Sequence, residues 1–255
     1  MRMRWDAKAY DVTHGFVSDY GRSLEQLVPQ GARTLLDLGC GTGTLTAELA
    51  GNVEHVIGLD SSPAMIEEAR RLHPGIDFRI GDACALTFEH EFDVVFSNAV
   101  FHWIADHHAL LRGIHRALRP GGLLVCEFGA HGNIACIEAA VDAALSRRGC
   151  TRRQRFNFPT DEAFRACLAQ EGFCDVSVRP YDRPTPLNNG RGGLGLWLRQ
   201  FHAADLESLP DEEQAELIAE VETDLEPTLW DAKAGRWVAD YRRIRAVAVA
   251  DSRGV

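Results

Sequence analysis

The sequence predicts an α/β fold in which helices cover both faces of a doubly wound, mostly parallel sheet. Three observations predict this fold: short apolar runs alternate with stretches of helical periodicity, a glycine-rich turn follows the first run, and Pro and Gly residues punctuate the helices. Strands that alternate with helices in this way form parallel sheets, because the chain must cross a face of the sheet between one strand and the next.

The first half of the chain supplies five expected strands and three helices between them. Apolar runs too short for helices predict buried strands over residues 33–38, 55–59, 77–80, 92–97 and 123–128. Helices are expected over residues 42–50, 64–72 and 109–118. Pro63 lies where a proline favours the start of the second helix, and Pro120 with Gly121 ends the third.

The second half shows a weaker pattern and predicts a separate cap. Helices are expected over residues 133–146, 160–170, 196–206, 210–225 and 237–250, and strands over residues 173–179 and 183–187. The glycine-rich loop 188–193 predicts a joint. We therefore expect an N-terminal lid segment (1–30), an α/β core (31–190) and a C-terminal helical cap (191–255).

Composition narrows the class of partner. The formal net charge of -10 argues against nucleic acid, because affinity for a phosphate backbone comes from Lys and Arg. No apolar stretch is long enough to span a bilayer, and the first ten residues lack the apolar region of a secretory signal. The seven cysteines are scattered without a C-x-x-C pair. We expect a reduced cytoplasmic protein with a small-molecule substrate, no metal site and no membrane association, while the oligomeric state stays open.

The turn after the first strand reads Asp-Leu-Gly-Cys-Gly-Thr-Gly over residues 37–43. Glycines allow a backbone turn to approach a ligand closely and to adopt positive φ. A dinucleotide-binding fingerprint, G-x-G-x-x-G, would need a glycine at position 44 or 46, but threonine stands at both. The spacing therefore counts against a nicotinamide-dependent dehydrogenase.

The G-x-G-x-G spacing resembles the first motif of class I S-adenosylmethionine-dependent methyltransferases, and three further matches follow in order. Asp60 ends the second strand, where the family binds the ribose hydroxyls. Asp82 and Ala83 follow the third strand, where the family meets the adenine, and residues 119–122 resemble the turn before its fifth strand. The matches span residues 33–128, about half of the chain. The resemblance implies a seven-stranded Rossmann-like fold, S-adenosyl-L-methionine as cofactor and S-adenosyl-L-homocysteine as product.

The resemblance also implies a set of cofactor-binding residues at the strand ends and in the leading segment. These candidates are Tyr10, His14, Asp37, Gly39, Cys40, Gly41, Thr42, Asp60, Ser61, Met65, Asp82, Ala83, Ser97 and Asn98. A carboxylate such as Asp60 can accept hydrogen bonds from both ribose hydroxyls. Structural roles remain open alternatives: Asp37 as an orienter of the loop, Asp60 as a helix cap and Asp82 as a turn residue.

The stretch after the fourth strand is the expected substrate side. It resembles the trans-aconitate and malonyl-carrier-protein type of small-carboxylate methyltransferases, and it implies a substrate pocket with Phe101, His102, Trp103 and the more distant His131. His102 and His14 are the candidate catalytic bases, because histidine titrates near neutral pH. Ordinary packing of the aromatic rings and a structural role for His102 are the alternatives.

Methyl transfer from a sulfonium needs mainly proximity, alignment and exclusion of water. We expect O-methylation of a carboxylate or a hydroxyl, and only the hydroxyl would need a base. Arginines can bind carboxylates bidentately, which makes a carboxylate substrate the working hypothesis, and solvated helix faces with surface ion pairs are the alternative explanation. The arginines in question are Arg147, Arg148, Arg152, Arg153, Arg155, Arg242, Arg243 and Arg245. One alternative is a protein of the same fold that binds S-adenosylmethionine but either does not methylate or catalyses another reaction. A second alternative is a methyltransferase that acts on nucleic acid or on protein.

Overall fold

The computed structural model describes residues 23–153 and 155–251. This part of the chain divides into two compact units. The first contains the described residues up to Ala130, Pro159–Pro180 and those from Ile244 onward. The second contains His131–Phe158 and Tyr181–Arg243. The lid segment expected over residues 1–30 lies mostly outside the described residues.

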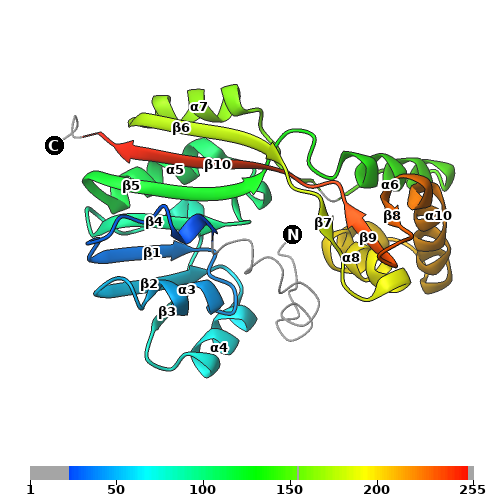
Figure 1. Ribbon diagram of the computed structural model, residues 1–255, viewed down its shortest axis with the longest axis horizontal. Helices are drawn as coiled ribbons and strands as arrows, with labels where there is room; N and C mark the ends of the chain where they lie inside the picture. Colours follow the sequence, from blue (N-terminus) through cyan, green and yellow to red (C-terminus); the bar gives the residue numbers. More distant parts are fainter. Residues whose placement is uncertain (1–22, 154, 252–255) are drawn as a thin grey trace. The chain divides into compact units, whose positions relative to one another are not determined.

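A seven-stranded sheet forms the centre of the first unit, in the order β3-β2-β1-β4-β5-β10-β6 (Figure 1). Its strands are β1 (Thr34–Leu38), β2 (His55–Asp60), β3 (Asp77–Ile80), β4 (Phe92–Asn98), β5 (Leu118–Gly129), β6 (Phe173–Asp182) and β10 (Arg242–Ala250). The pairs β1–β2, β1–β4, β2–β3 and β4–β5 are all parallel. The predicted fold class is confirmed, and the carboxyl ends of β1, β2 and β4 lie at one edge of the sheet.

Strand β10 runs against its neighbour β6. The amide after its last residue, Asp251, donates to the carbonyl of Gly172 just before β6 (N···O 2.9 Å). At the other end, the amide of Arg183 donates to the carbonyl of Tyr241 (2.7 Å). Bonds that join the end of one strand to the start of the other define an antiparallel pair. The first residues of β10 therefore lie at the edge where the parallel strands end.

The helix expected over residues 237–250 was wrong. Two strands, β9 (Arg236–Ala239) and β10, occupy this stretch. In β10, Ile244, Ala246 and Ala248 alternate into the main core, which is the period of a strand. The alanines suggested a helix because of their high helix propensity, but burial between strands decided the structure. The C-terminal segment is thus not wholly a helical cap.

Four helices of the first unit have more than one turn: α3 (Thr44–Leu49), α4 (Pro63–Leu72), α5 (His107–Ala117) and α7 (Asp161–Gln170). Side-chain caps fix the starts of three of them, through Ser62, Asp106 and Thr160. Adjacent residues of β1, Leu35 and Leu36, are fully buried in different apolar clusters. The sheet is therefore covered on both faces, which explains why its strands are continuous apolar runs.

The second unit combines helices with a small sheet. Its helices are α6 (Ala135–Arg147), α8 (Gly193–Phe201), α9 (Ala203–Leu206) and α10 (Asp211–Leu229). Its strands are β7 (Thr185–Pro186), β8 (Trp230–Asp231) and β9, in the antiparallel order β7-β9-β8. Helix α10 packs against α6, where Arg148 pairs with Glu220 (Nη1···Oε2 2.6 Å). These contacts hold together the two segments of the second unit, and the expected boundary of the core at residue 190 stays a prediction.

Candidate functional site

The glycine turn after β1 holds two glycines in different surroundings. Gly39 has φ 79°, and a Cβ there would collide with the side chain of Val100. Gly41 has φ 56°, and no atom of residues 23–153 or 155–251 lies within 4 Å of the position its Cβ would take. Packing within the protein explains the glycine at position 39. At position 41, the open space allows a ligand to approach the backbone.

Asp37 lies behind the turn. Its side chain is buried and accepts a hydrogen bond from the Thr46 hydroxyl (Oγ1···Oδ2 2.6 Å), which joins the end of β1 to helix α3. Burial raises the pKa of Asp37 to about 7; the Thr46 bond opposes this shift and the nearby charge of Asp60 adds to it. These contacts indicate that Asp37 anchors the glycine turn to helix α3.

Asp60, at the end of β2, is bonded to the same turn. Its carboxylate accepts from the amide of Gly41 (N···Oδ2 3.0 Å) and from the amide of Ser62 (N···Oδ1 2.8 Å). Burial raises the pKa of Asp60, and the backbone bonds oppose that rise. The tertiary structure therefore places Asp60, the residue predicted to bind the ribose, next to the accessible backbone of Gly41. Ser61 next to them is exposed.

The other predicted cofactor residues around these strand ends differ in accessibility. Asp82 is exposed, and its carboxylate accepts from the Cys84 amide (Oδ1···N 2.9 Å), capping a short 3₁₀ turn that begins at Ala83. Met65 is buried in the first turn of α4. Two further candidates are buried within the glycine turn, Cys40 and Thr42. Burial raises the pKa of the Cys40 thiol, which keeps it protonated at neutral pH.

The end of β4 adjoins the glycine turn. The hydroxyl of Ser97, a buried residue, donates to the Leu38 carbonyl (Oγ···O 2.8 Å) and so joins the ends of β4 and β1. Asn98 follows and is half-buried. Ala99 adopts a left-handed conformation (φ 61°), and its amide donates to the Glu127 carbonyl (2.7 Å). This sharp turn directs the chain away from the sheet edge and into the predicted substrate stretch.

The aromatic residues of that stretch are placed differently. Phe101 is fully buried and packs against Phe128 and Phe164 (ring centroids 5.3 and 6.3 Å), so its side chain is part of the core. Trp103 is half-buried and lies beside the ring of His102 (centroids 5.1 Å).

His102 itself is 7% exposed and has a backbone contact. Its Nδ1 accepts from the Gly129 amide at the end of β5 (3.4 Å). This bond requires an unprotonated Nδ1 and fixes the ring at the end of β5. His102 is therefore held at the edge where the cofactor candidates lie.

Two further predicted residues, Tyr10 and His14, lie outside the described residues. His131 is exposed and belongs to the second unit. The sequence reasoning missed one feature of this edge, an ion pair between Arg245 of β10 and Glu127 of β5 (Nε···Oε2 2.7 Å). Glu127 is nearly fully buried. The alternation in residues 242–250 was the signal that could have placed Arg245 on a strand.

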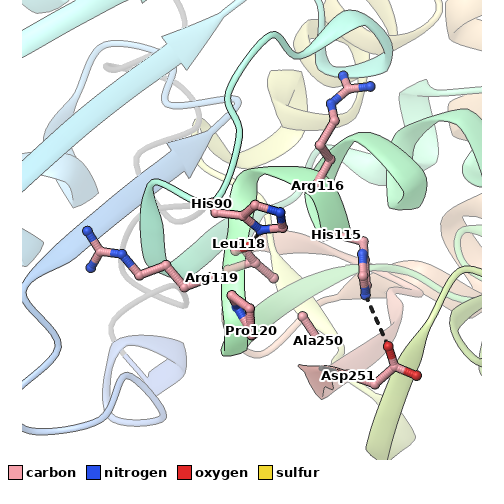
Figure 2. Close-up of a pocket in the computed structure, with 8 residues that line it drawn as sticks. All are labelled: His90, His115, Arg116, Leu118, Arg119, Pro120, Ala250 and Asp251. Carbon is pink, nitrogen blue, oxygen red and sulfur yellow. Dashed lines mark hydrogen bonds and ion pairs between the residues drawn. The ribbon is translucent and has the colours of Figure 1, made fainter. Parts of the chain in front are cut away.

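A cavity of about 180 Å³ lies elsewhere in the first unit, between the start of β5 and the end of β10 (Figure 2). His115 and Asp251 form an ion pair across one side (Nε2···Oδ1 3.6 Å). Ligands of open α/β sheets bind beyond the carboxyl ends of the parallel strands, and this cavity lies at the opposite edge. It is also smaller than the roughly 300 Å³ of a typical ligand pocket. The glycine turn therefore remains the candidate functional site.

Among residues 23–153 and 155–251, no group of three or more His, Cys, Asp or Glu side chains is arranged to hold a metal ion. No helix formed by these residues is both long enough and apolar enough to cross a membrane.

A glycine turn bonded to an acidic residue at the end of the second strand, on a sheet of this order, defines a class I S-adenosylmethionine-dependent methyltransferase. Comparison with known proteins agrees. A family model described as a methyltransferase domain matches residues 36–126. A methyltransferase of Schizosaccharomyces pombe is 32% identical, with 96% of this chain and 97% of that protein covered. The trans-aconitate 2-methyltransferase of Methylobacterium nodulans is 31% identical over the same shares of both chains.

The chain belongs to this methyltransferase family, and within it resembles the trans-aconitate type. Solved structures support the fold. The YcgJ protein of Bacillus subtilis superposes with a TM-score of 0.66 at 14% identity, covering 94% of this chain and all of that one. A phosphoethanolamine N-methyltransferase of Haemonchus contortus, solved with S-adenosylhomocysteine, gives 0.61 at 21% identity, covering 96% of this chain and 57% of that one. The protein is a methyltransferase that uses S-adenosyl-L-methionine, so the dehydrogenase and non-methylating alternatives fall away.

Proposed function

We propose that the enzyme transfers the methyl group of S-adenosylmethionine to a carboxylate of a small organic acid that carries more than one carboxylate. The observation that carries the proposal is the match, over nearly the whole of both chains, to a trans-aconitate 2-methyltransferase. Aconitate is a tricarboxylic acid, so an ester formed on one of its carboxylates would leave two carboxylates unmodified. The bound cofactor supplies an activated methyl on a positively charged sulfur.

The residues present fit this cofactor. Asp60 offers a half-buried carboxylate for the ribose hydroxyls, beside the open backbone of Gly41 for the methionine end. Asp82 is exposed next to Ala83 and suits the adenine amino group. The remaining cofactor candidates, Tyr10 and His14 among them, stay predictions, as does the cytoplasmic location.

A carboxylate acceptor makes the chemistry simple. One carboxylate oxygen forms a bond to the methyl carbon while the bond from that carbon to sulfur breaks, and the electron pair stays on sulfur. The reacting carboxylate becomes an uncharged methyl ester, the sulfonium becomes the uncharged thioether sulfur of S-adenosylhomocysteine, and no proton moves. The protein has only to align the two reactants and exclude water. No base is required, which is compatible with a site in which the Nδ1 of His102 accepts a hydrogen bond from the backbone amide of Gly129.

An acceptor screen tests the proposal. Purified enzyme is incubated with S-adenosylmethionine and a panel of mono-, di- and tricarboxylic acids, with hydroxy acids, phenols and amines as competitors of other chemistry. We expect S-adenosylhomocysteine and a methylated acid in equal amounts. Mild alkali should release methanol from this product, because alkali cleaves methyl esters and leaves methyl ethers and amines intact. Alkali-stable products from phenols or amines, with none from acids, would refute the proposal.

A further inference from the structure

The side chain of Val100 joins the glycine turn to the predicted substrate stretch. A Cβ at Gly39 would overlap Cγ2 of Val100 and would lie 2.8 Å from its Cγ1. Both γ-methyl groups of Val100 therefore lie directly against the backbone of Gly39, in the space that any other residue would fill with its own side chain. The contact is possible because position 39 is a glycine.

The glycine turn is held firmly where Val100 packs on it. The amide of Gly39 donates to the Leu59 carbonyl near the end of β2 (N···O 2.7 Å). On the other side, the hydroxyl of Ser97 in β4 donates to the Leu38 carbonyl (2.8 Å). Hydrogen bonds thus tie the start of the turn to both strands that flank β1. The contact therefore fixes the position of Val100 relative to the cofactor side.

Val100 also begins the substrate stretch. Its carbonyl accepts from the Trp103 amide (2.9 Å), which closes a short 3₁₀ turn. Within this turn Phe101 is fully buried, and Nδ1 of His102 accepts from the Gly129 amide at 3.4 Å. The 3₁₀ turn is therefore anchored to the core, to the end of β5 and, through Val100, to the glycine turn.

The surrounding structure imposes this position on Val100. The preceding residue, Ala99, has a left-handed conformation (φ 61°), which is strained for a residue with a side chain. The Glu127 carbonyl holds it there by accepting from the Ala99 amide (2.7 Å). Such strained residues persist where the structure around them holds them, and they are frequent at functional sites. Val100 itself is half-buried and packs against the main core.

We propose that Val100 is a positioning residue that sets the distance between the sulfonium of the bound cofactor and the methyl acceptor. Its γ-methyl groups act as a spacer between the turn that carries the cofactor and the stretch that carries the acceptor. The rate of an in-line transfer depends steeply on alignment, and a misplacement of about 1 Å can cost roughly 100-fold. The inference rests on the proposed function and adds a residue that aligns its two reactants.

Val100→Ala tests the proposal, with Val176→Ala as the matched control. Val176 is also a half-buried valine packed against the main core, but it belongs to the edge strand β6 and not to the candidate site. Single-turnover rates with both substrates saturating report the transfer step. With the best acceptor of the screen, whether or not it is an acid, we expect Val100→Ala to lower this rate at least ~10-fold. Val176→Ala should leave the rate unchanged.

Binding measurements separate alignment from affinity. In Val100→Ala, the calorimetric affinity for S-adenosylmethionine and the KM of the acceptor should stay close to the wild-type values, because the side chain spaces the two reactants and holds neither. Val100→Thr is the conservative variant. Threonine keeps both branches at Cβ, so it should restore most of the transfer rate.

Thermal melting tests the contact without any reaction. Gly39→Ala should lower the melting temperature of the otherwise wild-type protein, because the added Cβ collides with Val100. The same substitution should lower the melting temperature less in the Val100→Ala background, where the two γ-methyl groups are gone. Equal effects in the two backgrounds would show that the residues are not in contact, and this would overturn the proposal.

The kinetic outcomes are equally decisive. If folded Val100→Ala loses no more of the transfer rate than Val176→Ala, Val100 has no role in alignment. An unchanged rate with a higher KM, or with weaker binding of S-adenosylmethionine, would make Val100 a binding residue and overturn the proposal. If the wild type methylates phenols or amines and no acid, the proposed acceptor fails, but Val100→Ala should still slow transfer to those substrates.

Discussion

The hydroxyl of Thr46 donates to the carboxylate of Asp37 at 2.6 Å, and both side chains are buried. Burial raises the pKa of Asp37 from 3.8 to about 7. At pH values between these two pKa values, Asp37 binds more protons in the folded protein than in the unfolded chain. The contribution of Asp37 to the free energy of unfolding is therefore largest at low pH and falls as pH rises towards 7.

Replacement of Asp37 by Asn should remove this dependence. We expect the free energy of unfolding of the wild type, relative to Asp37→Asn, to fall by about 1 kcal/mol per pH unit between pH 5 and 7. Urea denaturation of both proteins across this range measures it, since other titrating groups cancel in the difference. Parallel curves for the two proteins would show that Asp37 titrates normally.

The two glycines of the turn should respond differently to substitution. Gly39→Ala adds a Cβ that collides with Val100 and also strains a positive φ, so we expect a loss of about 2–5 kcal/mol in stability. The Cβ added by Gly41→Ala meets no atom of the described residues, so the substitution should cost only about 1–2 kcal/mol of strain. Its main effect should be weaker binding of S-adenosylmethionine, by at least ~10-fold, because the methyl group occupies the space left for the ligand.

The control for Gly41 is Gly121→Ala. Gly121 also has positive φ (79°), and no atom in the described part of the chain lies within 4 Å of its Cβ position, but it lies within β5, before the buried part of the strand. It should show the same loss of stability with unchanged cofactor affinity. Chemical denaturation and calorimetry measure the two quantities separately. Equal cofactor affinity of the Gly41 and Gly121 variants would remove Gly41 from the cofactor site.

Asp60→Ala should weaken S-adenosylmethionine binding at least ~10-fold, because loss of a charge-assisted hydrogen bond costs about 1.5–3 kcal/mol. The variant also loses the bonds that join Asp60 to the amides of Gly41 and Ser62. The matched control is Asp77→Ala, an exposed aspartate at the start of β3, the neighbouring strand. Calorimetric titration of folded protein is the measurement. Similar dissociation constants for the two variants would argue against a ribose contact from Asp60.

His102→Gln tests whether the reaction needs a base. Gln can still accept a hydrogen bond from the Gly129 amide through its side-chain oxygen, but it cannot remove a proton at neutral pH. For a carboxylate acceptor we expect kcat to fall less than ~10-fold, whereas removal of a general base costs roughly 100-fold or more. Single-turnover rates at saturating substrate give the answer. A fall of 100-fold or more would indicate a hydroxyl acceptor.

Local patterns of residues were sufficient to predict the part of the fold that depends on neighbours in the chain. Short apolar runs and the residues that end them predicted every strand of the seven-stranded sheet other than β10. The predicted boundaries of most elements lie within a few residues of the observed ones. The order of the glycine turn, Asp60 and Asp82 along the chain also indicated the cofactor. These signals are local, because a buried strand and a turn that needs glycine are specified by adjacent residues.

Features that depend on contacts between residues far apart in the chain could not be predicted from local patterns. Val100 explains Gly39, whereas Gly41 is left open, although the two glycines look alike in sequence. Phe101 packs in the core against Phe128 and Phe164. Residues 242–250 form a strand because they pair between β5 and β6 in the main sheet. Arg183, just after the end of β6, and Arg243, at the start of β10, both lie against the ring of Tyr241 although they are far apart in the chain. Such contacts follow from the burial of whole elements against one another, and no local pattern of side chains encodes them.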